Sequence, residues 1–187
     1  MSREARVAAH ERDARNRDVV WTVADGRNGR RWRELAVDAS GAARSLVLET
    51  DGQGTWQRLE LSGADGLLTL HPEGDGSIHG NVTSRAGVRH LSLGKVKPAR
   101  IDIPGSLVAE AALCWAMTRQ LRVGERRTIA VVTVAEPVTV ALSEIVVERR
   151  TTATWELRDG DRRRLVELDE DGLPVGHLGA DRWPLEA

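Results

Sequence analysis

Apolar and polar residues alternate with a period of two along most of this chain, which predicts β-strands. The alternation begins at Val19, after a highly charged opening stretch, and it is bounded repeatedly by Gly, Asp and Pro. The segments with this pattern are residues 19–23, 31–37, 44–49, 55–61, 67–70, 77–83, 88–93, 127–135, 138–148, 151–157 and 165–169. We therefore expect a chain made mainly of short strands.

Asp-Gly pairs separate many of these segments and predict tight hairpins, because both residues tolerate a positive φ. They occur at residues 25–26, 51–52, 65–66, 75–76, 159–160 and 171–172. Hairpins between consecutive strands give an antiparallel, up-and-down order. The pairs are absent between Gly76 and Asp159, where a different element is expected.

One stretch, from Pro104 to Gly124, has the pattern of a buried helix. The Ser106 hydroxyl can cap its first turn, and Glu110 places a negative charge near the positive end of the helix dipole. Apolar residues cover more than one stripe, so most of the helix is expected in the core. We place it at about residues 106–121, with Gly124 as its terminator.

These patterns together predict a mainly β fold, a curved antiparallel sheet or open β-barrel wrapped around that one central helix. We expect a single β-rich domain over residues 19–187. Residues 1–18 are rich in Arg, Glu, Asp and Ala, and we expect a charged tail or a short helix there. A chain of 187 residues is long enough to bury a sizeable core.

Charge and composition restrict the classes of partner. The 27 basic and 28 acidic residues nearly cancel, which argues against nucleic acid as the main partner. No apolar run has the length of a transmembrane helix, and the opening residues lack the apolar core of a signal peptide. We therefore expect a cytoplasmic protein.

The chain has six Trp but no Phe or Tyr, so Trp must supply nearly all aromatic packing. Trp32, Trp56 and Trp155 lie in predicted strands, and Trp115 lies in the predicted helix. A curved sheet with a helix across it can enclose an apolar cavity, for which indole rings are suitable walls. The alternative for each Trp is that it fills the core.

A second candidate patch is polar. His79 and Asn81 share one face of a predicted strand, and His90 lies on the next strand. These residues complete the candidate ligand pocket, but their spacing contains no close pair of metal ligands, so we expect no metal site. Cys114 lies inside the helix without a neighbouring His and is expected to be unreactive. We find no catalytic motif and expect no cofactor.

Three stretches of the chain resemble a bacterial family described as glycolipid-binding, whose members form an incomplete, strongly curved antiparallel barrel. Residues 31–37 through 46–56, ending in Asp-Gly-Gln-Gly-Thr-Trp, are similar to that family's strand pair with Asp-Gly-x-Gly-x-Trp. Residues 121–125 resemble its Leu-x-x-Gly-Glu segment, and residues 168–175 resemble its closing Asp-x-Asp-Gly-Leu segment. The family's Thr-Pro-Phe-Thr-Asn-Thr-Leu-Pro segment has no counterpart here. Half-barrels that carry lipoproteins have a similar form.

The resemblance implies a curved barrel and lipid-related binding. We expect noncatalytic binding of an apolar or amphipathic small molecule, with a glycolipid or lipid as the candidate, in a cavity of the curved sheet. The alternative is a protein–protein interaction module, or a homodimer, with no internal ligand. An enzyme comes third, since that function needs converging polar groups in a cleft.

Overall fold

The computed structural model describes residues 6–12, 17–95, 100–135 and 138–175 of the chain. Its strands form two sheets, and the prediction of a mainly β, curved antiparallel fold around one helix is confirmed. The larger sheet has eight antiparallel strands in chain order: β1 (Arg6–Arg12), β2 (Asp18–Gly26), β3 (Gly29–Val37), β4 (Ala43–Asp51), β5 (Trp56–Gly63), β6 (Gly66–Pro72), β7 (Ile78–Ser84) and β8 (Gly87–Leu93).

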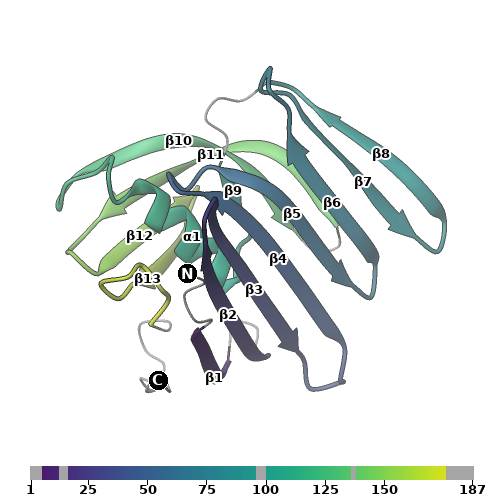
Figure 1. The fold of residues 1–187 in the computed structure, drawn as a ribbon, viewed down its shortest axis with the longest axis horizontal. Helices are drawn as coiled ribbons and strands as arrows, with labels where there is room; N and C mark the ends of the chain where they lie inside the picture. Colours follow the sequence, from purple (N-terminus) through teal and green to yellow (C-terminus); the bar gives the residue numbers. More distant parts are fainter. Residues whose placement is uncertain (1–5, 13–16, 96–99, 136–137, 176–187) are drawn as a thin grey trace.

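The smaller sheet has five strands, and it begins with the one parallel pair among the described residues, β9 with β10. Its strands are β9 (Ile101–Asp102), β10 (Arg126–Ala135), β11 (Thr139–Arg149), β12 (Thr154–Asp159) and β13 (Arg162–Glu167). The helix α1 (Leu107–Met117) contacts β3 of the larger sheet and β9 and β13 of the smaller one. Figure 1 shows α1 between the two sheets, with β7 and β8 far from the helix at the other end of the larger sheet.

Side chains of the larger sheet alternate between a buried and a solvent-facing side, as the period-two pattern predicts. In β3, Trp32, Glu34 and Ala36 are buried, whereas Arg31 and Arg33 are exposed. The buried side faces α1. The resulting core is continuous from β2 through the helix to β13, so the concave side of the open half-barrel is filled by the helix and by core side chains.

The helix begins where the sequence predicts and ends earlier than predicted. Ser106 is its N-cap, and the Ser106 hydroxyl accepts a hydrogen bond from the amide of Ala109. Residues 118–120 form turns instead of continuing the helix to 121. The Arg149 guanidinium donates to the carbonyl oxygens of Thr118 and Leu121, so a side chain from β11 satisfies this end. Gly124 is therefore not the terminator of the helix.

Two buried ionic groups attach α1 to the two sheets. Glu34 of β3 accepts hydrogen bonds from the Ser106 hydroxyl (2.9 Å) and the Val108 amide (3.2 Å), and its other oxygen accepts from Arg44 (2.7 Å). This carboxylate lies at the positive end of the helix dipole.

On the other side of the helix, Arg164 of β13 donates to both Asp102 and Glu110 at 2.8 Å. Burial lowers the pKa of Arg164, but the hydrogen bonds and charges of these two carboxylates outweigh that effect and raise it. The helix is thus held to the larger sheet by hydrogen bonds to the Glu34 carboxylate and to the smaller sheet by the ion pair between Glu110 and Arg164.

The N-terminal segment is corrected by the structure. Residues 6–12 form strand β1, which pairs with β2 in antiparallel register, and do not form a charged tail or a helix. The pairing supplies partners for the backbone groups along the β2 edge, which would otherwise be left open. Residues 1–5 and 13–16, and the predicted end of the β-rich domain at residues 176–187, lie outside the described residues.

Four turns share one five-residue geometry. In each, the amide of the first residue donates to the carbonyl of the fifth, and the fourth residue is a Gly with positive φ whose amide donates to the carbonyl of the first. The turns are residues 38–42, 51–55, 73–77 and 169–173. Three of them begin with Asp, whose Oδ1 also accepts from the third and fifth amides. Two of the four, at 51–55 and 169–173, contact α1.

Candidate functional site

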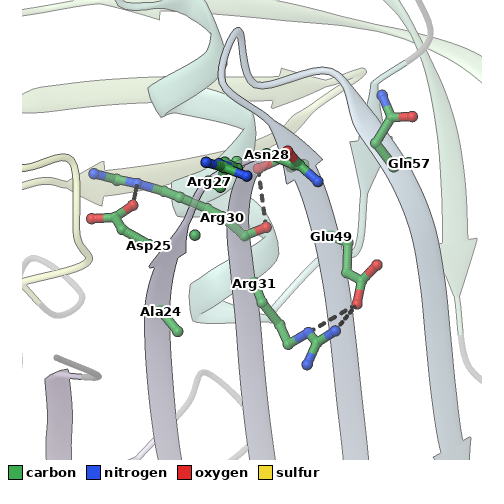
Figure 2. Close-up of a pocket in the computed structure, with 11 residues that line it drawn as sticks. Ala24, Asp25, Arg27, Asn28, Arg30, Arg31, Glu49 and Gln57 are labelled. Atoms are coloured by element: carbon green, nitrogen blue, oxygen red, sulfur yellow. Dashed lines mark hydrogen bonds and ion pairs between the residues drawn. The ribbon is translucent and has the colours of Figure 1, made fainter. Parts of the chain in front are cut away.

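An open pocket lies at the β2–β3 hairpin and extends toward α1. One part, of about 510 Å³, lies between the hairpin and the neighbouring ends of β4 and β5. An adjoining part, of about 530 Å³, has the same hairpin on one side and Trp115 of α1 on the other. The residues that line the first part are Ala24, Asp25, Gly26, Arg27, Asn28, Gly29, Arg30, Arg31, Glu49, Thr50 and Gln57 (Figure 2).

Trp115 supplies the aromatic wall of this pocket. It is the one half-buried residue of α1, whose other residues are all buried. Its ring packs against Trp32 at 5.9 Å between centroids with a tilt of 58°, and the Arg30 guanidinium lies 4.4 Å from its centroid. A tilted aromatic pair and a cation over the ring are both favourable contacts. They fix the indole at the border between the core and the pocket.

Arg30 forms the floor between the hairpin and the helix. Its Nε donates to Asp25 Oδ1 at 2.7 Å, and its Nη1 donates to the carbonyl oxygen of Asp171 at 2.7 Å. Its side chain is only 11% exposed, and Figure 2 shows the guanidinium turned toward Asp25. Arg30 therefore joins the larger sheet to the 169–173 turn that follows β13.

The two Gly-containing turns at 51–55 and 169–173 fit closely against α1, and Gly52 of the first also lines the pocket beside Trp115. A Cβ on Gly54 would lie 2.6 Å from the Cβ of Ala116, and a Cβ on Gly172 would lie 2.3 Å from Cδ1 of Trp115. Real Cβ atoms do not approach so closely, so a side chain at position 54 requires the helix to move and one at position 172 requires the Trp115 ring to move. Both segments carry the family resemblance in the sequence, and here they hold the helix in place.

The charges of the pocket are largely paired within it. Asp25 binds Arg30, and Glu49 binds Arg31 at 2.6 Å. Arg27 and Asn28 lie at the hairpin tip and are exposed. Within the described ranges, neither makes a side-chain hydrogen bond or an ion pair. The pocket thus combines an aromatic wall, paired charges and two side chains that can bind a ligand.

Of the Trp residues predicted to line a pocket, Trp115 alone lines the one described above. Trp32, Trp56 and Trp155 are 0%, 2% and 0% exposed and lie in the core. Trp32 also donates its indole N–H to Thr50 Oγ1 at 3.2 Å. These three fill core space that Phe and Tyr would fill in another chain. This agrees with the alternative considered for each Trp, that it packs in the core and lines no pocket.

The polar residues predicted for the same pocket lie elsewhere. Cross-strand pairs share one face of a sheet, and pairing from β3 to β8 places Asn81 and His90 on the face opposite to Trp32. Asn81 Oδ1 lies 2.5 Å from His90 Nδ1, and His79 lies 3.2 Å from the Ser77 hydroxyl. Asn81 and His90 therefore pair on the side of β7 and β8 that faces away from the core, and neither they nor His79 line the pockets described in this subsection.

The residues that sequence reasoning missed are Asp25, Arg27 and Arg30. In the sequence they belong to an Asp-Gly hairpin, whose charged residues are usually only solvated. Their link to Trp115, about 90 positions away in the sequence, arises from the packing of the helix on β3. A charged hairpin of this kind carries no signal of its own for a pocket.

Cys114 is fully buried beside the helix ion pair. Burial raises the pKa of its thiol well above the ordinary value, and the negative charges of Glu110 and Asp102 raise it further, against a smaller opposing effect of Arg164. A neutral, inaccessible thiol is a poor nucleophile. The described residues contain no group of three or more His, Cys, Asp or Glu side chains placed to hold a metal ion.

A smaller pocket of about 160 Å³ opens at the opposite ends of β3, β4 and β5. Leu61 and Val138 contribute apolar atoms to it, and Arg17 and Arg44 contribute charged ones. Its volume is about that of a short aliphatic chain.

Comparison with known proteins gives a fold and no activity. No known family profile and no curated protein sequence match the chain. Its structure is similar to the crystal structure of a DUF1089 family protein from Pseudomonas aeruginosa, with a TM-score of 0.60 and 17% sequence identity over 89% of this chain and 92% of that one. At this identity the likeness shows a shared fold alone. Across the described ranges, no helix has the length and apolarity to span a bilayer.

Proposed function

We propose that this protein is a noncatalytic binding module for an amphipathic small molecule whose polar head, of the sugar type, lies in the pocket between the β2–β3 hairpin and Trp115. The observation that carries the proposal is the half-buried indole of Trp115 beside an open pocket of about 530 Å³ edged by hydrogen-bonding side chains. The resemblance of three sequence segments to a glycolipid-binding family is consistent with it.

The chemistry of the pocket suits a sugar better than a fully apolar group. An indole presents a broad apolar face and can pack against the C–H groups of a pyranose ring. Asp25 lines the part that contains Trp115, and Asn28 and Gln57 line the adjoining part, so acceptors and donors for hydroxyl groups lie on both sides. Binding sites of roughly 300–1,000 Å³ with a few placed polar groups are typical of small-molecule recognition.

Because the core is filled, we expect the polar head group to make most of the contacts that bind the ligand. Trp32, Trp56 and α1 occupy the concave side of the sheet, where an internal acyl chain would otherwise lie. An alkyl tail then stays at the pocket mouth and adds little. We expect shallow polar binding of this kind to have a Kd of about 0.1–1 mM. A Kd of 1 mM corresponds to a binding free energy of roughly 4 kcal/mol.

A noncatalytic role fits the residue types that surround the pocket. The lining side chains include carboxylates, guanidiniums, amides, one hydroxyl and one indole, and both carboxylates are bound by arginines. Nucleophilic catalysis needs an activated hydroxyl, thiol, amine or carboxylate beside a base, and here the Thr50 hydroxyl accepts a hydrogen bond from the Trp32 indole. A cytoplasmic location, expected from the sequence, belongs to the same proposal.

The test is a titration of Trp emission with octyl β-D-glucoside below its micelle concentration, with methyl β-D-glucoside and octanol as the separated head and tail. We expect both glucosides to shift the emission with similar Kd values and octanol to have little effect. Trp115→Phe should remove the shift, because Trp115 is the pocket's only aromatic residue among those described. An unchanged emission with both glucosides, or an equal shift in Trp115→Phe, would contradict the proposal.

The second candidate is a homodimer formed through the edge of the larger sheet. In the described part of the chain, β8 is hydrogen-bonded only to β7, and Val88 on this strand is 60% exposed. An open edge strand can pair with the same strand of a second copy. Light scattering after size exclusion distinguishes the two candidates: this alternative requires a dimer that Val88→Lys converts to a monomer.

A further inference from the structure

We infer that the head group bound in this pocket carries one negative charge, as a carboxylate or a phosphodiester, and that Arg27 recognises it. The inference rests on the proposed function, because it names the class of ligand for the same site. It is based on the distribution of charge around the pocket.

Three arginines and two carboxylates line the pocket. Arg30 pairs with Asp25, and Arg31 pairs with Glu49, so four of the five charges are compensated. The Arg27 guanidinium remains, with no ion pair to any side chain in the described ranges. The pocket therefore carries a net charge of +1 in a protein whose formal net charge is −1.

The position of Arg27 is set by a rigid hairpin. Gly26 and Gly29 pair across the turn, so Arg27 and Asn28 occupy its tip. Gly29 lies so close to β4 that a Cβ there would be 1.9 Å from the carbonyl oxygen of Thr50. The tip is thereby held against the neighbouring strand, and Figure 2 shows Arg27 and Asn28 at the end of the hairpin above the Arg30 side chain. Arg27 is also a lining residue of the part of the pocket that contains Trp115.

A guanidinium in this position favours one class of partner. Its planar array of N–H donors matches the two oxygens of a carboxylate or a phosphodiester. Asn28 can donate to the same group or accept from a neighbouring hydroxyl. Asp25 and Glu49 disfavour further negative charge, so the expected ligand is a monoanion. An acidic sugar, or a sugar or polyol attached through a phosphodiester, has this chemistry.

The experiment compares three heads by calorimetry at low ionic strength: methyl β-D-glucoside, methyl β-D-glucuronide and glycerophosphoinositol. We expect at least one of the two monoanions to bind roughly tenfold more tightly than the neutral glucoside. The glucuronide tests a carboxylate, and glycerophosphoinositol tests a phosphodiester. The ratio of the Kd of the neutral glucoside to the Kd of the tighter monoanion measures this preference. Raising the salt from about 10 mM to about 300 mM should reduce the ratio severalfold, because the Debye length falls well below the dimensions of the pocket.

The variant that tests the residue is Arg27→Gln, which keeps a hydrogen-bonding side chain and removes the charge. It should bring the ratio of the neutral to the anionic Kd close to one, because the monoanions lose the guanidinium charge that favours them over the neutral glucoside. Arg162→Gln is the matched control, because Arg162 also lies beside an Asp-Gly hairpin, is exposed and makes no side-chain hydrogen bond or ion pair in the described ranges. It should leave the ratio unchanged.

The outcomes separate the inference from the proposed function. If all three heads bind equally well, the charge inference fails and the proposed function stands. If Arg27→Gln keeps the full preference, or if Arg162→Gln loses it as well, recognition by Arg27 is wrong. If no head binds at all, the proposed function itself fails.

Discussion

At the scale of single residues, the geometry of the site depends on how closely the backbone approaches α1. Trp115 can stand at the border of the pocket because position 172 has no side chain. The Arg30 guanidinium then covers the indole and binds the carbonyl of Asp171. One glycine and one arginine therefore fix the orientation of the aromatic wall.

Gly172→Ala should destabilise the protein by about 2–5 kcal/mol. A left-handed backbone costs an alanine about 1–2 kcal/mol, and the clash with Trp115 adds about 1–3 kcal/mol. Gly41→Ala is the control: Gly41 occupies the same turn geometry with φ 84°, and its Cβ would meet no atom within 4 Å. Urea unfolding of both variants gives the difference, and equal losses would show that the turn does not press on Trp115.

Trp115 itself is less buried than the sequence suggests. An apolar helix predicts a core indole, whose deletion costs about 3–5 kcal/mol. Because its ring is half-buried and borders a pocket, we expect a smaller loss for Trp115→Ala, of about 1–3 kcal/mol. A loss above that range in urea unfolding would contradict the position described for the ring.

At the scale of elements, α1 is held by buried ionic groups more than by its own amphipathicity. Nearly every residue of the helix is buried, so no polar face marks which sheet it meets. Glu34 determines which side of the helix faces the larger sheet, and Arg164 determines which side faces the smaller one. Buried charges of this kind are costly unless paired, so their geometry fixes the orientation of the helix.

Glu34→Gln should lower the free energy of unfolding by about 3 kcal/mol. The change removes the charge that the Arg44 guanidinium binds on Glu34, and it removes a negative charge from the helix N-terminus. Glu49→Gln breaks the ion pair with Arg31, in which the two side chains are 30% and 52% exposed, and should cost about 0–1 kcal/mol. Chemical denaturation distinguishes the two, and similar losses would contradict the structural role of Glu34.

The sequence predicts the strands and the start of the helix because both depend on local periodicity and capping. Ser106 is an example, since its role requires only the residues that follow it. The pocket could not be predicted in the same way. It joins Arg30, Trp115 and Asp171, which are far apart in the chain, and alternation alone places Trp32 on a buried face without showing whether that face encloses a cavity.

At the scale of the whole molecule, α1 packs against strands of both sheets, and Cys114 is buried on this helix. Its thiol is 0% exposed. Access to it therefore requires α1 to separate from at least one sheet, which makes the thiol a reporter of opening. Labelling by a thiol reagent at neutral pH should follow the rate of unfolding, and rapid labelling of the folded protein would contradict this arrangement.

The same thiol predicts a pH dependence. The unfolded thiol has a pKa of about 8.5, and the pKa in the folded protein is raised by burial, so stability is unaffected below about pH 8 and falls as pH rises above the unfolded value. The slope is at most about 1.4 kcal/mol per pH unit. Cys114→Ala should lack this component, so the two unfolding free energies should converge toward pH 10. If the unfolding free energies of the two proteins keep a constant difference between pH 8 and pH 10, the raised pKa of the Cys114 thiol is contradicted.

The proposed function requires that the pocket beside Trp115 bind the polar head of a ligand. Two-dimensional NMR of the indole N–H groups tests it most directly, because the chain has only six Trp and Trp115→Phe assigns the relevant signal. On titration with methyl β-D-glucuronide and with methyl β-D-glucoside, we expect the Trp115 signal to move most, that of the adjacent Trp32 to move less, and that of Trp155, in the core of the smaller sheet, to stay fixed. Saturating shifts at Trp155 without a shift at Trp115, or no shift at any indole, would contradict the claim.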